Sequence, residues 1–231
     1  MQGLNPVWDA SYKENQNFLF YPSEEIIRFV SKYIVKRKGL NSYEGINPNW
    51  MQTRSLDIGC GIGRHLVYLK EIGLEVWGID ISGVAIDHAR SWWREKGFSN
   101  PDKHIIKSSA SNMIFEENTF DYAFSHGTLD SMPFDDAKIA MREIHRVMKK
   151  EGLFYLDLIS NDDSSVLSGF EGDTIVQADH EKGTVQSYFT ISKVKVLLSE
   201  YFTIIECKLI KHLDYINDRN HSRFHQVLRC V

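Results

Sequence analysis

The sequence has few cysteines, little net charge and no long apolar run. Its three cysteines, Cys60, Cys207 and Cys230, form no paired spacing, which disfavours a secreted, disulfide-held protein. The formal net charge of -4 gives no overall positive field to attract nucleic acid or an anionic membrane. No stretch approaches the roughly 20 apolar residues of a membrane span. We therefore expect a cytoplasmic protein with a small-molecule partner and neither a nucleic-acid nor a membrane partner; the oligomeric state stays open.

Short apolar runs alternate with amphipathic stretches along the chain. This alternation predicts an α/β fold, a parallel sheet with helices on both faces. The expected helices include one that begins after Ser23 and one over 135–150, and 40–52 is expected to be a loop. Strands are expected at 54–58, 75–80, 104–108, 120–125, 153–159, 203–210 and 224–230.

The end of the chain sets the direction of the last strand. Only the short polar stretch YINDRNHS lies between the last two strands, so they can pair as a hairpin but not as a parallel crossover. The sequence thus predicts a Rossmann-like, doubly wound, seven-stranded, mostly parallel sheet with an antiparallel last strand. Before it, β-prone pieces at 174–178 and 184–189 flank the turn-like HEKG and predict an inserted hairpin.

A glycine-rich turn follows the first predicted strand. Gly59, Gly61 and Gly63 omit the Cβ atom, so the backbone can turn tightly and approach a ligand beside the positive end of the next helix. Asp80 closes the second strand, where a carboxylate can accept hydrogen bonds from ribose hydroxyls. Asp57 repels a pyrophosphate and attracts an ammonium group. The pattern predicts a site for an adenosine cofactor that is not a dinucleotide.

Four stretches carry a resemblance to a known family. LDIGCGIGR at 56–64, VWGIDIS at 76–82, ASNMIFEENTFDYAF at 110–124 and REIHRVMKKEGLFYLDLIS at 142–160 resemble the class I S-adenosylmethionine-dependent methyltransferases. The resemblance implies a methyltransferase with S-adenosyl-L-methionine as cofactor, and it leaves the acceptor open. It also implies one domain over 1–231: an arm and helix at 1–50, a cofactor-binding core at 51–160, an inserted hairpin or lid at 161–190, and a helix and strand hairpin at 191–231.

The resemblance also implies roles for residues of the glycine turn and the second strand. Gly59, Gly61 and Gly63 would border the methionine part and the ribose. Asp57 would act around the amino group, and Asp80 would hold the ribose hydroxyls. Cys60, inside the turn, would contribute to the cofactor site as a small space-filling residue.

Other cofactor contacts are expected along the next strands. Ile81 would pack on the adenine, with Ser109 and Ala110 beside it, although the family commonly has an acid where this chain has Ser109. The backbone of Ser125 would face the methionine amino group. Arg64 would either reach the methionine carboxylate or be solvated.

The resemblance and the residue types also suggest a lid and a base. Trp8 and Tyr12, in WDASY, would fold over the cofactor or pack an N-terminal arm onto the core. Methyl transfer from a sulfonium needs no obligatory catalytic side chain, but His126, just past the fourth strand, is the best-placed candidate base. Its alternative is an ordinary loop histidine, and Asp130 in the same loop could be a helix-capping acid.

Two other functions compete, and a metal site is not expected. A nicotinamide-dependent oxidoreductase would have G-x-G-x-x-G, whereas Arg64 stands where the third glycine belongs. A cofactor-binding scaffold without catalysis would keep the same fold. The spacing of His180, His221 and His225 matches neither a zinc site nor a helical pair.

Overall fold

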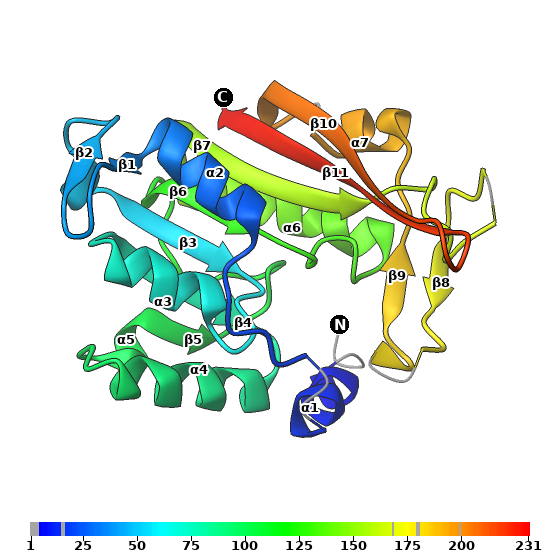
Figure 1. Ribbon diagram of the computed structural model, residues 1–231, viewed down its shortest axis with the longest axis horizontal. Coiled ribbons are helices and arrows are strands. Elements are labelled where there is room, and N and C mark those ends of the chain that lie inside the picture. The colour runs from blue at the N-terminus through cyan, green and yellow to red at the C-terminus, as the bar shows by residue number, and fades with distance from the viewer. Residues whose placement is uncertain (1–4, 15–16, 168, 179–180, 199) are drawn as a thin grey trace.

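The structure is a computed structural model that describes residues 5–14, 17–167, 169–178, 181–198 and 200–231. Figure 1 shows a central sheet covered by helices. The helices are α1 Asn5–Lys13, α2 Glu24–Tyr33, α3 Arg64–Glu71, α4 Gly83–Glu95, α5 Pro101–His104, α6 Phe134–Val147 and α7 Ile191–Leu198, with a 3-10 turn at Trp50–Gln52. Among the described residues, no helix combines the length and apolarity needed to cross a membrane.

Seven strands form the central sheet in the order β10-β11-β7-β6-β3-β4-β5. Neighbours from β5 to β7 are parallel, whereas β11 is antiparallel to both β7 and β10. The predicted α/β sheet with an antiparallel last strand is therefore confirmed. The strands are β3 Arg54–Ile58, β4 Glu75–Asp80, β5 Ile105–Lys107, β6 Phe120–Ser125, β7 Met148–Ile159, β10 Phe202–Asp214 and β11 Arg219–Cys230.

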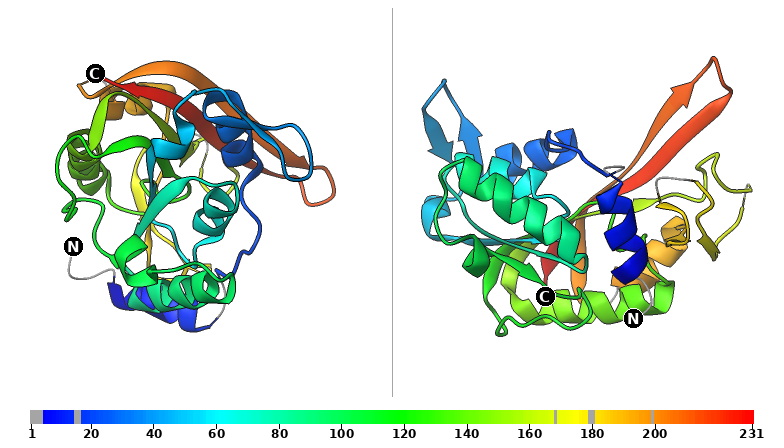
Figure 2. Two further views of the ribbon diagram at one scale, coloured as in Figure 1. Left: turned by 90° about the vertical axis from the view of Figure 1, so that its left-hand side faces the viewer. Right: turned by 90° about the horizontal axis from the view of Figure 1, so that it is seen from below.

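The last two strands are longer than the sequence pattern predicts. Their pairing continues from Phe202 opposite Cys230 to Asp214 opposite Arg219. Figure 2 shows the resulting β10–β11 hairpin extending well beyond the body of the protein. The outer half of this hairpin is polar, so the pattern of apolar residues predicts only its inner half.

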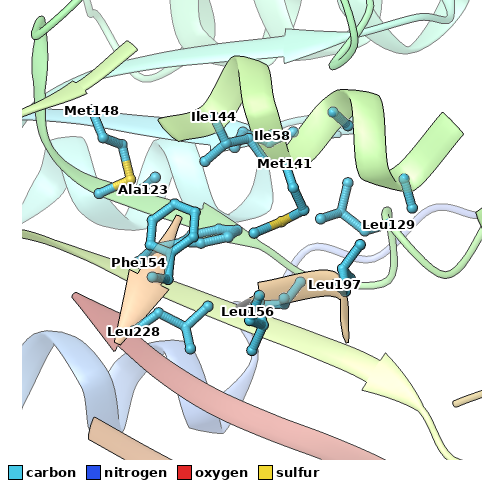
Figure 3. Close-up of a cluster of buried hydrophobic side chains, with 14 of the residues drawn as sticks. Ile58, Ala123, Leu129, Met141, Ile144, Met148, Phe154, Leu156, Leu197 and Leu228 are labelled. Atoms are coloured by element: carbon cyan, nitrogen blue, oxygen red, sulfur yellow. The ribbon is translucent and has the colours of Figure 1, made fainter. Parts of the chain in front are cut away.

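Apolar residues on alternate sides of the strands build one core on each face of the sheet. Helices α6 and α7 cover one face, where Met141, Ile144 and Leu197 pack on Phe154 and Leu228 (Figure 3). Helices α2, α3 and α4 contribute to the core on the other face. Helices on both faces are thus confirmed, and the carboxyl ends of the parallel strands are left free to form a site.

The predicted boundary between α6 and β7 is wrong. The helix was expected to extend to residue 150, but it ends at Val147, and β7 already begins at Met148. Glu151 adopts a positive φ of 66°, and the register against β6 shifts there. The Lys149 ammonium binds the Asp121 carboxylate at 2.8 and 2.9 Å instead of facing a helix end. This irregular strand start depends on pairing with β6, which local sequence does not show.

Two small hairpins lie outside the central sheet. One is formed by β1 Val35–Arg37 and β2 Tyr43–Gly45, and its second strand lies in the predicted loop before β3. The predicted insertion contains the other, formed by β8 Asp173–Ile175 and β9 Val185–Ser187, which is shorter than expected. His180, between those strands, lies outside the described residues.

Candidate functional site

A cavity of about 290 Å³ lies beside the carboxyl ends of β3, β4 and β6. These strands flank the point where the strand order reverses, the usual ligand position in such sheets. Most of the predicted site residues line it: Trp8, Tyr12, Gly59, Cys60, Gly61, Arg64, Asp80, Ile81, Ser109, Ala110 and His126. Asp57, Gly63 and Ser125 do not line the cavity.

The turn between β3 and α3 leaves no room for side chains at two positions. Gly59 and Gly61 have φ values of 70° and 53°, which L side chains rarely adopt. A Cβ at Gly59 would lie 2.1 Å from Thr128 Oγ1, and one at Gly61 would lie 2.7 Å from Tyr12 Oη. The turn is therefore pressed between the β6 loop on one side and α1 on the other, and its bare backbone faces the cavity.

Asp80 ends β4 and faces the turn from the neighbouring strand. Its Oδ2 accepts a hydrogen bond from Gly61 N at 2.9 Å, and its Oδ1 accepts one from Ser82 N at 2.8 Å. Burial raises the pKa of Asp80 to about 6, although these backbone hydrogen bonds act in the opposite direction. Each carboxylate oxygen can accept a further hydrogen bond. Asp80 is thus placed to receive two hydroxyl groups in the cavity.

The loop after β5 supplies the far end of the cavity. Ser109 and Ala110 line it beside Ile81. The Ser109 hydroxyl lies 2.9 Å from Ser111 Oγ, and it accepts a hydrogen bond from Ser111 N at 3.3 Å. This end combines an apolar side chain with hydroxyl groups, which suits a flat heteroaromatic ring.

Comparisons with known proteins assign the core. Residues 56–156 match the family described as a methyltransferase domain. Residues 56–156 are therefore similar to a methyltransferase domain, the fold family that the sequence motifs indicate. The resemblance stated from the sequence is confirmed, and the rival oxidoreductase reading is not supported.

Two curated relatives are similar to the chain in sequence, and a solved structure is similar to it in fold. The chain is 34% identical over 109 residues to Sterol 4-C-methyltransferase strm-1 of Caenorhabditis elegans, covering 47% of this chain and 32% of that protein. It is 33% identical over 104 residues to Demethylmenaquinone methyltransferase of Staphylococcus aureus, covering 44% and 41%. A SAM-dependent methyltransferase structure from Methanosarcina mazei superposes with a TM-score of 0.62 at 22% identity, covering 78% and 92%. The chain thus spans less than half the length of the two curated relatives.

Helix α1 covers the cavity of the methyltransferase domain. Trp8 and Tyr12 of this helix line the cavity, with ring centroids 6.5 Å apart. Figure 1 shows α1 beside the start of α4. Asp9 makes this link: its carboxylate accepts hydrogen bonds from Ser82 Oγ at 2.6 Å and Val84 N at 3.3 Å. The aromatic arm therefore lies over the glycine turn, and its position depends on the hydrogen bonds between Asp9 and the N-terminus of α4.

Substitution of Asp9 tests this attachment. We expect Asp9→Ala to lower the free energy of unfolding by about 1 kcal/mol, as for other lost helix caps. We also expect weaker binding of S-adenosylhomocysteine, because α1 leaves the closed position more often. Titration calorimetry and thermal unfolding would measure both effects. The exposed Asp135, at the start of α6, provides the control: Asp135→Ala should leave S-adenosylhomocysteine affinity unchanged, and an equal loss in both variants would contradict a lid role.

Asp57 and Ser125 lie behind the cavity wall. The Asp57 side chain is buried, and its Oδ2 is 3.7 Å from Nδ1 of His65. His65 lines the cavity, and its Nε2 accepts a hydrogen bond from Ser23 N at 3.3 Å. The cavity wall near Asp57 is thus formed by His65, which the sequence interpretation missed. Its position in the first turn of α3, directly after Arg64, was the available signal.

Gly63 and Cys60 contribute to the close packing around the turn. A Cβ at Gly63 would lie 3.2 Å from Ala89 Cβ of α4, so the glycine allows α3 to pack closely. The Cys60 side chain is buried, and burial raises the pKa of its thiol, with the charges of Asp80 and Asp57 adding to the effect. The expectation that Cys60 fills space, and is not a reactive thiol, agrees with this environment.

His126 lies in the cavity wall between charged neighbours. Its Nδ1 is 3.3 Å from Nη2 of Arg64, and its Nε2 is 3.7 Å from Oδ2 of Asp157. Because arginine only donates, Nδ1 must be the acceptor, and the proton of the neutral ring is on Nε2. Burial lowers the pKa of His126 to about 4. The imidazole is therefore neutral at physiological pH.

A buried ionic group lies beneath His126. Arg223 of β11 donates from Nε to Asp157 and from Nη2 to Asp130, both at 2.6 Å. Asp157 also accepts a hydrogen bond from Gly127 N at 2.7 Å, and Asp130 accepts one from Ile159 N at 2.8 Å. Asp130 is therefore a buried partner of Arg223 and not a helix cap. Sequence reasoning missed Arg223, because β11 is far along the chain from the residues it joins.

The described residues contain no cluster of three or more metal-ligating side chains. His221 instead lies 2.7 Å from Asp163 at the base of the projecting hairpin, and His225 bonds Tyr155 Oη at 2.7 Å. These contacts are structural and remote from the turn.

Proposed function

We propose that the protein transfers the methyl group of S-adenosylmethionine to a small organic acceptor. The observation that carries the proposal is the placement of the Asp80 carboxylate opposite a side-chain-free turn in one cavity. The named activities of the two relatives, on a sterol and on demethylmenaquinone, support a small and largely apolar acceptor. The free thiols of Cys60, Cys207 and Cys230 agree with the expected reducing cytoplasm.

The residues present fit the cofactor. Asp80 would hold the ribose hydroxyls, and the bare backbone of Gly59 and Gly61 would border the ribose and the methionine part. The adenine would lie between Ile81 and the loop of Ser109 and Ala110. At the other end we propose that Asp57 acts on the amino group by its charge from behind the cavity wall, and that the Ser125 backbone, Gly63 and Cys60 shape the turn around it.

The methyl donor supplies an activated group, because the sulfonium is its own leaving group. The protein must therefore hold the acceptor in line with the methyl group and exclude water. Tyr12 and Trp8 would exclude water from above. A general-base role for His126 stays a prediction. The neutral ring has its one basic lone pair on Nδ1, and this lone pair accepts a hydrogen bond from Arg64. To act as a base, His126 must exchange that hydrogen bond for one from the methyl acceptor.

The acceptor side is formed by the segments that match the family least. Leu19 of the N-terminal arm, Met132 of the β6 loop and Glu181 of the insertion line the cavity there. Two aromatic residues after the N-terminal arm have other positions: Phe20 packs on Trp92 of α4, with ring centroids 5.2 Å apart, and Tyr21 is exposed. Specificity is thus expected from loops, whereas the cofactor contacts come from the sheet edge.

The proposal can be tested without knowledge of the acceptor. Titration calorimetry should show binding of S-adenosylhomocysteine and none of NAD. Methyl-labelled S-adenosylmethionine, incubated with extracts of small metabolites, should yield a labelled product only with active protein. Cofactor binding without any labelled product across such pools would favour the scaffold alternative, and NAD binding would refute the cofactor assignment.

Binding of S-adenosylhomocysteine should weaken in acid. The ionised form of Asp80 accepts from ribose hydroxyls, and its pKa of about 6 in the free protein places its protonation between neutrality and pH 5. Because a protonated carboxyl must lose its proton to bind in this way, affinity should fall about tenfold from pH 7 to pH 5. 5′-Methylthioadenosine keeps the ribose but lacks the amino-acid charges, so it should show the same dependence. Affinity that is constant over this range would contradict the role of Asp80.

A further inference from the structure

We propose that Arg223 and Asp157 are positioning residues that act through His126 to hold the Arg64 guanidinium as the seat for the cofactor's carboxylate. The inference rests on the proposed function, and it assigns a task to the buried ionic group beneath the cavity. The chain of contacts runs from β11 through β7 and the β6 loop to α3.

The group begins with Arg223, which the antiparallel pairing places at the carboxyl end of β7. Arg223 is opposite Ile159 in the register, and its side chain is only 16% exposed. Its two hydrogen bonds, each 2.6 Å long, bind separate carboxylates. Burial lowers the pKa of Arg223, but Asp130 and Asp157 more than reverse this, so the guanidinium stays charged. A buried arginine with two such bonds fixes both acids in position.

The next link is Asp157, which joins β7 to the loop after β6. One carboxylate oxygen accepts from Gly127 N at 2.7 Å, and the other accepts from Arg223 and lies 3.7 Å from His126 Nε2. Although burial favours protonation, the charge of Arg223 leads the contributions that lower the pKa of Asp157, so it is ionised. The negative charge thereby favours the ring tautomer with hydrogen on Nε2.

The last link is the hydrogen bond from Arg64 to His126. With the proton on Nε2, the Nδ1 lone pair accepts from Arg64 Nη2 at 3.3 Å. A guanidinium has five donors, and no other hydrogen bond from Arg64 is present among the residues that the structure describes. The side chain lines the cavity at the N-terminus of α3. It therefore presents a positive charge and spare donors beside a helix dipole of the same sign.

The charges select the occupant of this position. Asp130 and Asp157 both pair with Arg223, and among the residues that the structure describes Arg64 forms no ion pair, so its charge is left for an anion in the cavity. The methionine part of the cofactor carries one anionic group, its carboxylate, and a planar carboxylate matches the guanidinium in two parallel hydrogen bonds. We expect this pairing to place the methionine chain between the glycine turn and His126.

Two probes distinguish this role from a structural one. S-Adenosylhomocysteine carries the carboxylate, and 5′-methylthioadenosine has the same nucleoside and thioether without it. Calorimetry should show that Arg64→Met lowers the affinity for S-adenosylhomocysteine at least about 30-fold. The affinity for 5′-methylthioadenosine should fall less than about threefold. Loss of affinity for both probes, or for neither, would overturn the assignment of Arg64.

The positioning residues need matched variants. His126→Phe should lower the affinity for S-adenosylhomocysteine about tenfold and leave that for 5′-methylthioadenosine unchanged. His126→Asn, whose amide oxygen can replace Nδ1 as acceptor, should recover most of the lost affinity. Arg223→Met should change the affinities for the two probes in the same way as His126→Phe. If Arg223→Met does not fold, Arg223→Lys keeps the charge but cannot hold both acids, and a smaller loss confined to S-adenosylhomocysteine is expected.

The outcomes separate this inference from the proposed function. If the wild-type protein binds neither probe, the proposed function fails. If it binds both equally well, the proposed function stands and the seat for a carboxylate does not exist. If the Arg223 variants weaken both probes alike, Arg223 is structural only, and its proposed positioning role is overturned.

Discussion

Substitution of Asp80 with asparagine is expected to weaken S-adenosylhomocysteine binding about 100-fold. The Asp80 carboxylate already accepts from Gly61 N and Ser82 N, and it has lone pairs left for two ribose hydroxyls. An asparagine amide has only one acceptor oxygen. Its NH2 group cannot accept a hydrogen bond, so it would face a backbone N–H or a ribose hydroxyl without replacing the lost acceptor. Loss of two hydrogen bonds to a charged group, at about 1.5 kcal/mol each, gives this magnitude.

Calorimetry with a matched carboxylate checks this expectation. Asp136 also lines the cavity, but it comes from α6 and belongs neither to the glycine turn nor to β4. Asp136→Asn should therefore change S-adenosylhomocysteine affinity by less than about twofold. The melting temperature of Asp80→Asn should fall only a little, because loss of the acceptor for one backbone N–H is offset by removal of a carboxylate whose charge is disfavoured by burial. Wild-type affinity in Asp80→Asn would remove the main support for the cofactor site.

Substitution of Gly59 with alanine is expected to destabilise the protein by at least about 3 kcal/mol and to abolish detectable cofactor binding. A φ of 70° costs an L residue about 1–2 kcal/mol. The new Cβ would also lie 2.1 Å from Thr128 Oγ1, which itself donates to Ile58 O at 3.0 Å. The turn or the β6 loop must then move, and both border the cavity.

Gly97 offers the control for this substitution. It has a similar φ of 77°, but nothing lies within 4 Å of an added Cβ. Gly97→Ala should therefore show only the conformational cost of about 1 kcal/mol, with unchanged S-adenosylhomocysteine affinity. Chemical denaturation and calorimetry of the two variants would isolate the effect of close approach at Gly59. Equal destabilisation in both would contradict that account.

The sheet could be predicted because its signals are local. Each parallel strand is an apolar run bounded by turn residues, and the short polar link before β11 forces the antiparallel hairpin. The start of β7 could not be predicted in this way, because residues 148–150 continue the helical pattern and become a strand only by pairing with Phe120 of β6. The β1–β2 pair was missed for a related reason. Its strands have only three residues each; β1 follows directly after α2, and β2 lies in a stretch rich in turn formers.

The candidate site divides along the same line. The glycine turn and Asp80 follow two successive strands, so their meeting at one sheet edge follows from topology. Arg223 reaches the site only because β11 pairs with β7, and Tyr12 covers Gly61 only because α1 folds back onto α4. Such contacts join residues far apart in the chain, and no periodicity or spacing encodes them. The ionic group beneath His126 therefore became visible only in the folded protein.

A crystal structure of the protein with S-adenosylhomocysteine tests the central claim most directly. The account predicts both ribose hydroxyls within hydrogen-bonding distance of the Asp80 carboxylate, with the thioether beside the backbone of Gly59 and Gly61. A nucleoside bound elsewhere, or one in this cavity whose ribose points away from Asp80, would contradict it.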